Sequence, residues 1–405
     1  MTKTVKTDIA ILGGGIAGLW MMNILRQRGY SCVLLETNTL GGQQTLLSQG
    51  IIHGGLKYAL SGTLSNESEA IAGMPDRWRK NIAGNGDIDL KDVRVLSDTQ
   101  YLWSAGSVAS RFTTFFASKM LRGRIEKLPF NDYPPALKSE RFKGNVYRMD
   151  DLVIDTPSLL RALIAPVAEQ ILRFDANQDA IEWNENGIAA IRTGGTRIEP
   201  SVSILAAGAG NAALLDAAHT HGLARGINAQ IRPLHMLVVK HTLDFPFYAH
   251  CIGASNKPRL TVTTHSLADG SHVWYLGGDI AERGVDMSEA ALIAAGKKEL
   301  SQLFPWIDFS QAEFAGVRID RAEPAQNALA KPDNAFAQRD KNLIVSWPTK
   351  LTLAPDLGDR VTALLADLEP SHNEITLDPE LQRAALGTPA WHNLFGHGLS
   401  GNNNG

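Results

Sequence analysis

The chain has few of the residues that would cross-link a small fold or bind nucleic acid. Only two cysteines occur, Cys32 and Cys251, so there is no disulfide framework, no CxxC redox pair and no zinc or other metal site to expect. The formal net charge is -3 over 405 residues, without the basic excess of nucleic-acid-binding proteins. No apolar run approaches the ~20 residues of a membrane span, and the first residues lack a signal-peptide core. We therefore expect a cytoplasmic globular protein.

Residues 7–36 carry the most informative pattern. The apolar run 8–12 predicts a buried strand, and Gly13, Gly15 and Gly18 follow it in GxGxxG spacing. In such a loop the first glycine makes a tight turn, the second lets a pyrophosphate approach the backbone, and the third lets helix and strand pack closely. The helix predicted after the loop would direct free N–H groups and its positive dipole end at that pyrophosphate.

An acidic residue completes this pattern. Residues 32–35 predict a second strand that ends at Glu36, where a carboxylate can accept hydrogen bonds from a ribose hydroxyl. Strand, glycine loop, helix, strand and acid in this order predict a dinucleotide-binding site, whereas glycines alone would indicate only a flexible turn.

The middle of the chain alternates between helix and strand signals. Residues 150–156 predict a turn, followed by a helix over 157–170 with Thr156 as its N-cap. Residues 180–206 form three short apolar pieces split by turn residues, which predict strands.

The following part changes character. Residues 230–280 are rich in β-branched and aromatic residues joined by turns, which predicts an antiparallel sheet. Ser288 is the expected N-cap of a helix to Phe304. From about Glu369 the chain is polar and ends in GNNNG, so we expect a loosely held tail.

The length suits two domains. We expect an α/β, Rossmann-like dinucleotide-binding domain made of separated segments, with an antiparallel substrate sheet inserted between them. The expected dinucleotide-binding segments are 1–85, 150–218 and 318–368, the expected substrate-domain segments are 86–149 and 219–317, and the expected tail is 369–405.

One later segment places glycines after a strand. ILAAGAGNAALL, residues 204–215, is too short to be the second dinucleotide unit that a two-dinucleotide nicotinamide reductase needs. The electrons are therefore expected to come from a small substrate. The segment, with Ala207 and Gly208, is similar to the strand-then-glycine segment that closes the FAD domain of glutathione-reductase-like flavoproteins.

Two further segments carry a resemblance to a known family. GIIHGGLKY (residues 50–58) and AGVRIDRAEP (residues 315–324) resemble segments of the D-amino-acid-oxidase-like superfamily, most closely its glycerol-3-phosphate dehydrogenase and 2-hydroxyglutarate oxidase branches. The resemblance spans most of residues 7–365 and implies FAD as cofactor. Two departures concern the substrate: Lys57 stands where glycerol-3-phosphate dehydrogenases have a phosphate-binding arginine, and WPTKLTLAPDLGD replaces a glycine-rich final segment.

The candidate FAD-binding residues follow from the fingerprint and the resemblance. The loop after the second strand would contact the pyrophosphate, the alternative being a solvated loop. By resemblance, the helix start after Lys350 would direct N–H groups at the flavin C2 carbonyl, the alternative being a surface lysine. The candidates are Gly13, Gly15, Ile16, Ala17, Gly18, Glu36, Thr37, Gln43, Gln44, Thr45, Ser48, Gln49, Ala207, Gly208, Lys350, Leu351 and Thr352.

Four residues are candidates for the chemistry. His235 or His53 would take a hydroxyl proton as hydride leaves; each could instead be a structural histidine. Lys57 and Arg318 would hold a substrate anion. Lys57 could instead form a surface pair with Tyr58, and Arg318 could instead form an ion pair with Asp320 or Glu323. Arg318 and Arg321, at a spacing of three along a strand, should face opposite sides of the sheet, and the resemblance favours Arg318.

Weaker candidates lie nearby. The substrate-side candidates are Tyr58, Arg232, Tyr275 and Arg321, with His250 and His265 as alternatives to His235. Residues 108–124 predict an amphipathic helix with basic neighbours. It would pack on its own domain, or form a membrane-surface patch at the cytoplasmic face that gives access to quinone.

These observations favour an FAD-dependent oxidoreductase. It would oxidise the CH–OH group of a small anionic substrate, a 2-hydroxy acid or polyol phosphate, by hydride transfer to flavin N5. The alternatives are a CH–NH oxidase of an amino acid or secondary amine and a flavin-binding protein without turnover. The electron acceptor, whether oxygen, quinone or an electron carrier, stays open.

Overall fold

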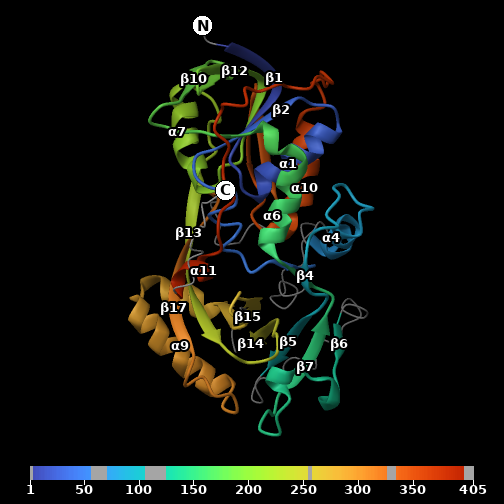
Figure 1. Ribbon diagram of the computed structural model, residues 1–405, viewed down its shortest axis with the longest axis vertical. Coiled ribbons are helices and arrows are strands. Elements are labelled where there is room, and N and C mark those ends of the chain that lie inside the picture. The colour runs from blue at the N-terminus through green and yellow to red at the C-terminus, as the bar shows by residue number, and fades with distance from the viewer. Residues whose placement is uncertain (1–2, 56–70, 105–124, 254–257, 326–333, 396–405) are drawn as a thin grey trace, which may run out of the picture.

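The computed structural model describes residues 3–55, 71–104, 125–253, 258–325 and 334–395 (Figure 1). The molecule is elongated, with one large sheet in each of two lobes and a small sheet at their junction. We call the large sheets the parallel sheet and the mixed sheet.

The parallel sheet confirms the expected α/β dinucleotide-binding fold. Its parallel strands lie in the order β9, β2, β1, β12 and β19. The antiparallel strands β11 and β10 extend it from β12, and the antiparallel strand β18 extends it from β19. The strands are β1 (Lys3–Leu12), β2 (Cys32–Glu36), β9 (Ile171–Arg173), β10 (Ala180–Asn184), β11 (Gly187–Thr193), β12 (Thr196–Leu205), β18 (Phe336–Asp340) and β19 (Leu343–Trp347).

Helices cover both faces of this sheet, because its central strands are apolar on both sides. On one face α1 (Ile16–Gln27) packs against α6 (Thr156–Ile164) and α10 (Ala354–Leu364). On the other face lies α7 (Asn211–Thr220), which buries Leu215 against Leu205 and Val345. The carboxyl ends of β1, β2 and β12 therefore meet at one edge, where a nucleotide would bind.

The mixed sheet confirms the antiparallel sheet expected over residues 230–280. Its order is β17, β13, β16, β15, β14, β5, β7 and β6, and only the β14–β5 pair is parallel. The strands are β5 (Gln100–Ser104), β6 (Ile125–Lys127), β7 (Asn145–Met149), β13 (Ala229–His241), β14 (Ala249–Ile252), β15 (Pro258–Ser266), β16 (His272–Gly277) and β17 (Glu313–Pro324).

One face of the mixed sheet is apolar and covered by α9 (Glu289–Leu303). Leu237, Trp274 and Leu276 from the sheet pack against Leu292 and Leu300 of this helix. The Ser288 hydroxyl accepts a hydrogen bond from the Ala291 N–H, so the predicted N-cap is confirmed. The short α8 (Asp279–Arg283) also packs on this sheet, against β13, β15 and β16. We call the α9 side the helix-covered face.

The small sheet corrects the prediction of a turn at residues 150–156. It consists of β3 (Ile51–Ile52), β8 (Leu152–Ile154) and β4 (Val95–Ser97), with α4 (Met74–Ile82) beside it. Residues 152–154 are apolar and fully buried, so they pair as a strand. The N-cap of α6 is Asp155, whose carboxylate accepts from the Ser158 N–H, and the predicted cap Thr156 lies inside the helix.

The tail is packed rather than loosely held over its described part, residues 369–395. The Ser371 hydroxyl donates to the Asp8 carboxylate at 2.6 Å, and Leu386 pairs with Leu40 beside the glycine loop. The short α11 (Ala390–Leu394) then buries Trp391 against the mixed sheet. The polar composition concealed these contacts because a few buried groups suffice to hold such a segment.

A search of the described residues finds no helix whose length and hydropathy would suit a membrane span.

Candidate cofactor and substrate site

The glycine loop has the close packing that its spacing predicts. Gly13 has a φ of +118°, and a Cβ added there would lie 2.5 Å from the Ala206 carbonyl oxygen. A Cβ on Gly18 would lie 1.9 Å from the Gly13 carbonyl oxygen. Both distances are far inside van der Waals contact, so β1, α1 and β12 can meet at this point only through glycine.

The N-terminus of α1 fits a pyrophosphate. Gly15 is the N-cap of α1 and has no side chain that could accept a hydrogen bond from the first turn, and the described first turn contains no acidic residue. A Cβ on Gly15 would meet only the Thr45 hydroxyl oxygen, 3.4 Å away, among the described residues. That hydroxyl accepts a hydrogen bond from the Ile16 N–H at 3.0 Å, which leaves Ala17 and its neighbours to direct N–H groups at an anion.

Glu36 is fixed at the carboxyl end of β2. Its carboxylate accepts one hydrogen bond from the Gly14 N–H at 2.6 Å and another from the Asn38 N–H at 2.7 Å, while Thr37 beside it is exposed. The acid therefore lies at the mouth of the glycine loop, as the prediction of a ribose contact requires.

The loop after β2 joins the two lobes. The Gln49 amide donates to the Tyr275 carbonyl oxygen at 2.8 Å, and the Gln44 side-chain oxygen accepts from the Ala322 N–H at 3.1 Å. Gln43 is exposed and Ser48 is half-buried on the same loop. The segment predicted to contact a cofactor thus also contacts the mixed sheet, on the side away from α9, which we call the loop-facing side.

The segment after β12 lies at the same edge of the parallel sheet. The Ala207 N–H donates to the Asn211 side chain at 2.9 Å, and the Gly208 carbonyl oxygen accepts from the Trp347 indole at 3.1 Å. Gly208 has a φ of +58° and open space at its Cβ position among the described residues.

His53 and the start of α10 meet at the junction of the lobes. The Thr352 hydroxyl donates to the buried His53 carbonyl oxygen at 3.2 Å, and the Thr352 carbonyl oxygen accepts from the Trp78 indole at 2.9 Å. Lys350 and Leu351 begin the 3-10 turn that leads into α10, and within the described part of the chain no side-chain hydrogen bond caps that helix. Its N–H groups can therefore face a bound anion or carbonyl.

His235 and Arg318 lie side by side on β13 and β17, but on the helix-covered face. The His235 Nδ1 atom is 3.0 Å from the Gly284 carbonyl oxygen, and His235 is 3% exposed. The Arg318 guanidinium donates to the Val285 and Met287 carbonyl oxygens at 2.9 and 3.0 Å. Both side chains anchor the connection between α8 and α9, which corrects their placement beside a substrate.

Arg321 lies on the opposite, loop-facing side, as the spacing of three predicts. It is half-buried beside Arg232, and its Nε donates to the Arg232 carbonyl oxygen at 3.2 Å. The Arg232 guanidinium donates in turn to the Glu323 carboxylate at 2.6 Å. The Gln44 side chain of the loop after β2 bonds to the backbone of the next residue, Ala322. Of the two arginines, Arg321 is therefore the one on the side of β17 that faces this loop.

Tyr275, His265 and Trp391 form an aromatic cluster on the same side. The Trp391 and His265 rings stack with centroids 4.2 Å apart, and Tyr275 lies 5.2 Å from Trp391. Burial lowers the pKa of His265 to about 4 and raises the pKa of Tyr275 far above its usual value. Both side chains are therefore neutral near pH 7. Trp391 was not predicted, although a tryptophan in a polar tail is itself a sign of a packed contact.

Other predicted residues fall outside this description or add a structural contact only. Lys57, Tyr58 and the amphipathic segment 108–124 lie outside the described residues. His250 is buried on the loop-facing side, where its Nδ1 atom is 2.8 Å from the Thr261 hydroxyl oxygen.

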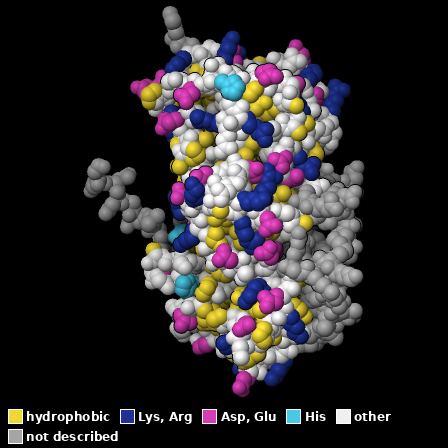
Figure 2. Space-filling model, turned by 90° about the vertical axis from the view of Figure 1, so that its right-hand side faces the viewer, with side chains coloured by type: hydrophobic (Ala, Val, Ile, Leu, Met, Phe, Trp, Pro, Cys, Tyr) yellow, Lys and Arg dark blue, Asp and Glu magenta, His cyan; other side chains and the backbone are white. Residues whose placement is uncertain are grey.

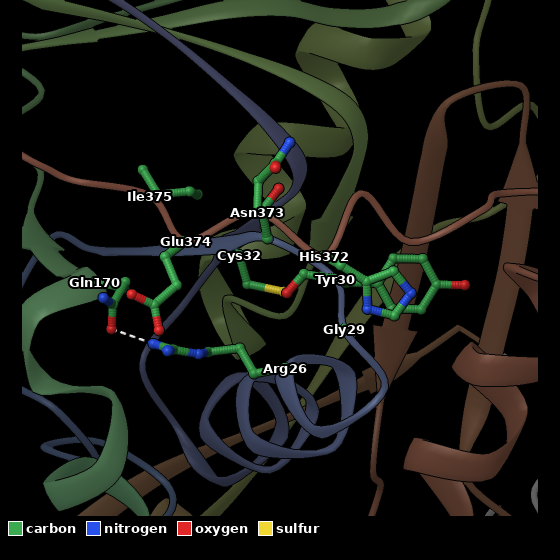
Figure 3. A pocket seen from close by; sticks show the side chains of 10 residues that line it. Arg26, Gly29, Tyr30, Cys32, Gln170, His372, Asn373, Glu374 and Ile375 are labelled. Carbon is green, nitrogen blue, oxygen red and sulfur yellow. Dashed lines mark hydrogen bonds between the residues drawn. The ribbon is translucent and has the colours of Figure 1, made fainter.

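A separate cavity of about 180 Å³ lies at the other end of β2 (Figure 3). Arg26, Gln170 and His372 line it, and Figure 3 shows the Arg26 guanidinium hydrogen-bonded to the Gln170 side chain. It lies beside Cys32, where β2 begins, whereas a nucleotide would bind where β2 ends at Glu36. We therefore do not assign the cavity to the cofactor or the substrate.

Comparison with known proteins agrees with this geometry. The family model described as DAO, FAD dependent oxidoreductase, matches residues 8–345. A probable FAD-dependent oxidoreductase of Pseudomonas aeruginosa is 49% identical over 98% of this chain and 100% of its own length. The crystal structure of an FAD-dependent oxidoreductase from that organism, 45% identical, superimposes with a TM-score of 0.83 over 98% of this chain and 100% of its own.

Two further likenesses are more distant. Glycine oxidase from Geobacillus kaustophilus shares the fold, with a TM-score of 0.63 at 16% identity over 92% of this chain and 96% of its own. One component of the anaerobic glycerol-3-phosphate dehydrogenase of Haemophilus influenzae is 32% identical over 65 residues, 16% of this chain and 12% of its own. On the family model and the Pseudomonas relative, the chain belongs to the DAO family of FAD-dependent oxidoreductases.

Proposed function

We propose that this oxidoreductase acts on the CH–NH group of a small amino acid or secondary amine that carries a carboxylate. The observation that carries the proposal is the placement of His235 and Arg318 on the helix-covered face, where both bind backbone carbonyl oxygens. The residues best suited to take a hydroxyl proton and hold a hydroxy acid are thereby turned away from the loop-facing side.

An amine makes smaller demands on the protein than an alcohol. An alcohol holds its proton until a positioned base takes it, a contribution of about 10²–10⁴-fold in rate. An amine can bind in its neutral form, so its nitrogen lone pair assists departure of the hydride without such a base. Neutral surroundings such as Tyr275 and His265 suit this requirement, since burial keeps both uncharged near pH 7.

FAD supplies the hydride acceptor of such a reaction. The residues around the glycine loop fit it: Gly15 leaves room at the N-terminus of α1, and Glu36 stands at the mouth of the loop. Thr352 and the uncapped start of α10 would face the flavin end. Arg321, on the loop-facing side beside Gln44, would bind the substrate carboxylate.

A second candidate is oxidation of a 2-hydroxy acid or polyol phosphate. It rests on His53, which is buried at the junction of the lobes, with its Nδ1 atom accepting from the Gly55 N–H at 3.2 Å and its carbonyl oxygen bonded to Thr352. His53 would then be the base. The short match to the glycerol-3-phosphate dehydrogenase component is in keeping with this candidate.

Anaerobic mixing of the holoenzyme with amino acids, N-methylated amino acids, 2-hydroxy acids and polyol phosphates tests both candidates. We expect an amino acid or secondary amine to bleach the flavin absorbance. Bleaching by hydroxy acids or polyol phosphates alone would contradict the proposal and support the second candidate.

Variants of His53, Arg321 and Arg318 test the roles proposed for these three residues. For an amine substrate we expect His53→Asn to change kcat less than about tenfold, whereas an alcohol oxidase would lose about 10²-fold or more. Arg321→Met should raise KM, while Arg318→Met, the matched variant on the other face, should lower stability with KM unchanged. If Arg318→Met raised KM and Arg321→Met left KM unchanged, Arg318 would be the residue that binds the substrate.

A further inference from the structure

The loop-facing side of β13 and β17 carries a compact group of charged side chains. Arg232 and Arg321 are direct partners in the pairing of the two strands, and Glu323 lies two residues further along β17, opposite Gln230. Because side chains alternate along a strand, residues two positions apart project from the same side. We call Arg232, Arg321 and Glu323 the charged cluster.

Within the charged cluster Glu323 is paired with Arg232. The Glu323 Oε1 atom accepts hydrogen bonds from the Arg232 Nε atom at 2.6 Å and from the Gln230 amide at 2.7 Å, and Glu323 is 8% exposed. Carboxylates buried to this extent are found together with such a partner, because burial of an unpaired charge is costly. The charge of Arg232 is therefore balanced inside the protein.

Arg321 supplies the remaining positive charge of the cluster. It is half-buried, and its Nε atom donates to the Arg232 carbonyl oxygen at 3.2 Å. Two guanidinium groups and one carboxylate leave the charged cluster with a net charge of one positive unit. This charge matches a ligand that carries a single carboxylate.

We propose that Glu323 is a specificity-determining residue that restricts the substrate to amines with one carboxylate. It acts through its charge and does not need to touch the substrate. Two residues along a strand span about 7 Å. A ligand held by Arg321 that carried a second carboxylate would therefore be repelled by Glu323, while Arg232 is already paired. The inference rests on the proposed oxidation of an amine, and it narrows the substrate to monocarboxylic amino acids and secondary amines.

The test compares two ligands of the same shape, neither of which has an amine to oxidise. Succinate carries two carboxylates, whereas succinamate carries one carboxylate and one neutral amide. Titration of the holoenzyme, followed by the flavin absorbance, gives a Kd for each, and we expect the wild type to bind succinamate more tightly. Glu323→Gln keeps the size of the side chain and an oxygen that can accept from Arg232. In this variant the ratio of the two Kd values should shift about tenfold in favour of succinate.

A charge-restoring variant distinguishes this role from a structural one. Arg232→Gln combined with Glu323→Gln removes both charges of the pair, so the net charge of the cluster is again one positive unit and the wild-type ratio should return. The matched control is Glu313→Gln, at the opposite end of β17, where Glu313 is exposed and lies 3.6 Å from the Lys240 ammonium. It should leave the ratio unchanged.

A second variant keeps the test valid if Glu323→Gln does not fold. Gln230→Lys leaves the Glu323 carboxylate in place and sets an ammonium beside it, so the net charge of the cluster changes by the same amount. The inference is overturned if the wild type binds succinate as tightly as succinamate, or binds neither. It is also overturned if the folded variants leave the ratio unchanged, or if the double variant keeps the ratio of Glu323→Gln. The expected ratios without reduction of the flavin by any amine would overturn the proposed function alone.

Discussion

The Tyr275 hydroxyl donates a hydrogen bond of 2.8 Å to the Leu47 carbonyl oxygen, and this contact joins the mixed sheet to the loop that follows β2. Tyr275 is fully buried, and on the same loop Gln49 returns a hydrogen bond to the Tyr275 carbonyl oxygen. The loop predicted to contact the FAD pyrophosphate is thus positioned from the lobe that would carry the substrate.

Tyr275→Phe should lower the stability and weaken FAD binding together. The change removes the donor of a part-buried hydrogen bond to the Leu47 carbonyl oxygen, at a cost of about 0.5–1.5 kcal/mol. Differential scanning calorimetry and FAD titration of the apoprotein measure the two effects. The control is Tyr133→Phe, whose hydroxyl lies 3.5 Å from the Gly144 carbonyl oxygen. Equal FAD affinity in Tyr275→Phe and wild type would show that the loop is held without this bond.

Two glycines of the fingerprint should respond differently to alanine. In Gly18→Ala the added Cβ would lie 1.9 Å from the Gly13 carbonyl oxygen, so the fold should lose about 3 kcal/mol. In Gly15→Ala the Cβ meets only the Thr45 hydroxyl oxygen among the described residues, so the apoprotein should keep its stability while FAD affinity falls. Apoprotein melting temperatures and FAD titrations distinguish the two. Strong FAD binding by Gly15→Ala would place the pyrophosphate elsewhere.

The buried His265 predicts a loss of stability in acid. Burial lowers its pKa from 6.5 to about 4, so between these pH values the unfolded chain binds a proton that the folded chain does not. Stability therefore falls as pH drops from about 6.5 to 4, by on the order of 3 kcal/mol from this residue. His265→Phe keeps an aromatic ring against Trp391 and should flatten this part of the curve. Urea unfolding at several pH values measures it; an unchanged slope would assign the effect to other groups, such as His241, whose pKa burial also lowers.

Trp391 should hold the tail in place. It is 2% exposed and packs on His265 and Tyr275, so Trp391→Ala should cost about 3–5 kcal/mol if the site does not collapse. Because the preceding residues pair with Leu40 beside the glycine loop, FAD should also dissociate faster. Thermal melting and the rate of flavin release check both. Leu394→Ala, at a position 38% exposed on the same helix, is the control, and equal behaviour of the two variants would contradict this role.

The parallel sheet and its glycine loop could be predicted because their signals are local. Strand, GxGxxG, helix and acid occupy consecutive positions, so Gly13, Gly18 and Glu36 lie where the spacing placed them. The strands β5, β6 and β7 were not predicted. They are short, and they become strands by pairing with each other and with the distant β14.

Residue spacing alone could not predict which face of β13 and β17 is covered by α9 and which faces the loop after β2. The separation of Arg318 and Arg321 fixed that they face opposite sides, but not which side α9 covers. That depends on how residues 278–303 fold back over the sheet.

The distribution of surface charge adds little to the proposal that Arg321 binds the substrate carboxylate. Figure 2 shows acidic and basic side chains interspersed over the described surface on that side of the molecule. The field on that side is therefore short-ranged, and recognition of a small anion depends on individual side chains such as Arg321.

The pairing of β13 with β17 restricts how the molecule can open. It runs without a break from Ala229 and Pro324 to Lys240 and Glu313, and Ala229 and Ala322 pack into the core of the parallel-sheet lobe. Bending the lobes apart would break hydrogen bonds of this continuous β13–β17 pairing, so a hinge motion between the lobes would cost free energy. We therefore expect substrate and product to enter and leave by local displacement of loops, without a hinge motion between the lobes.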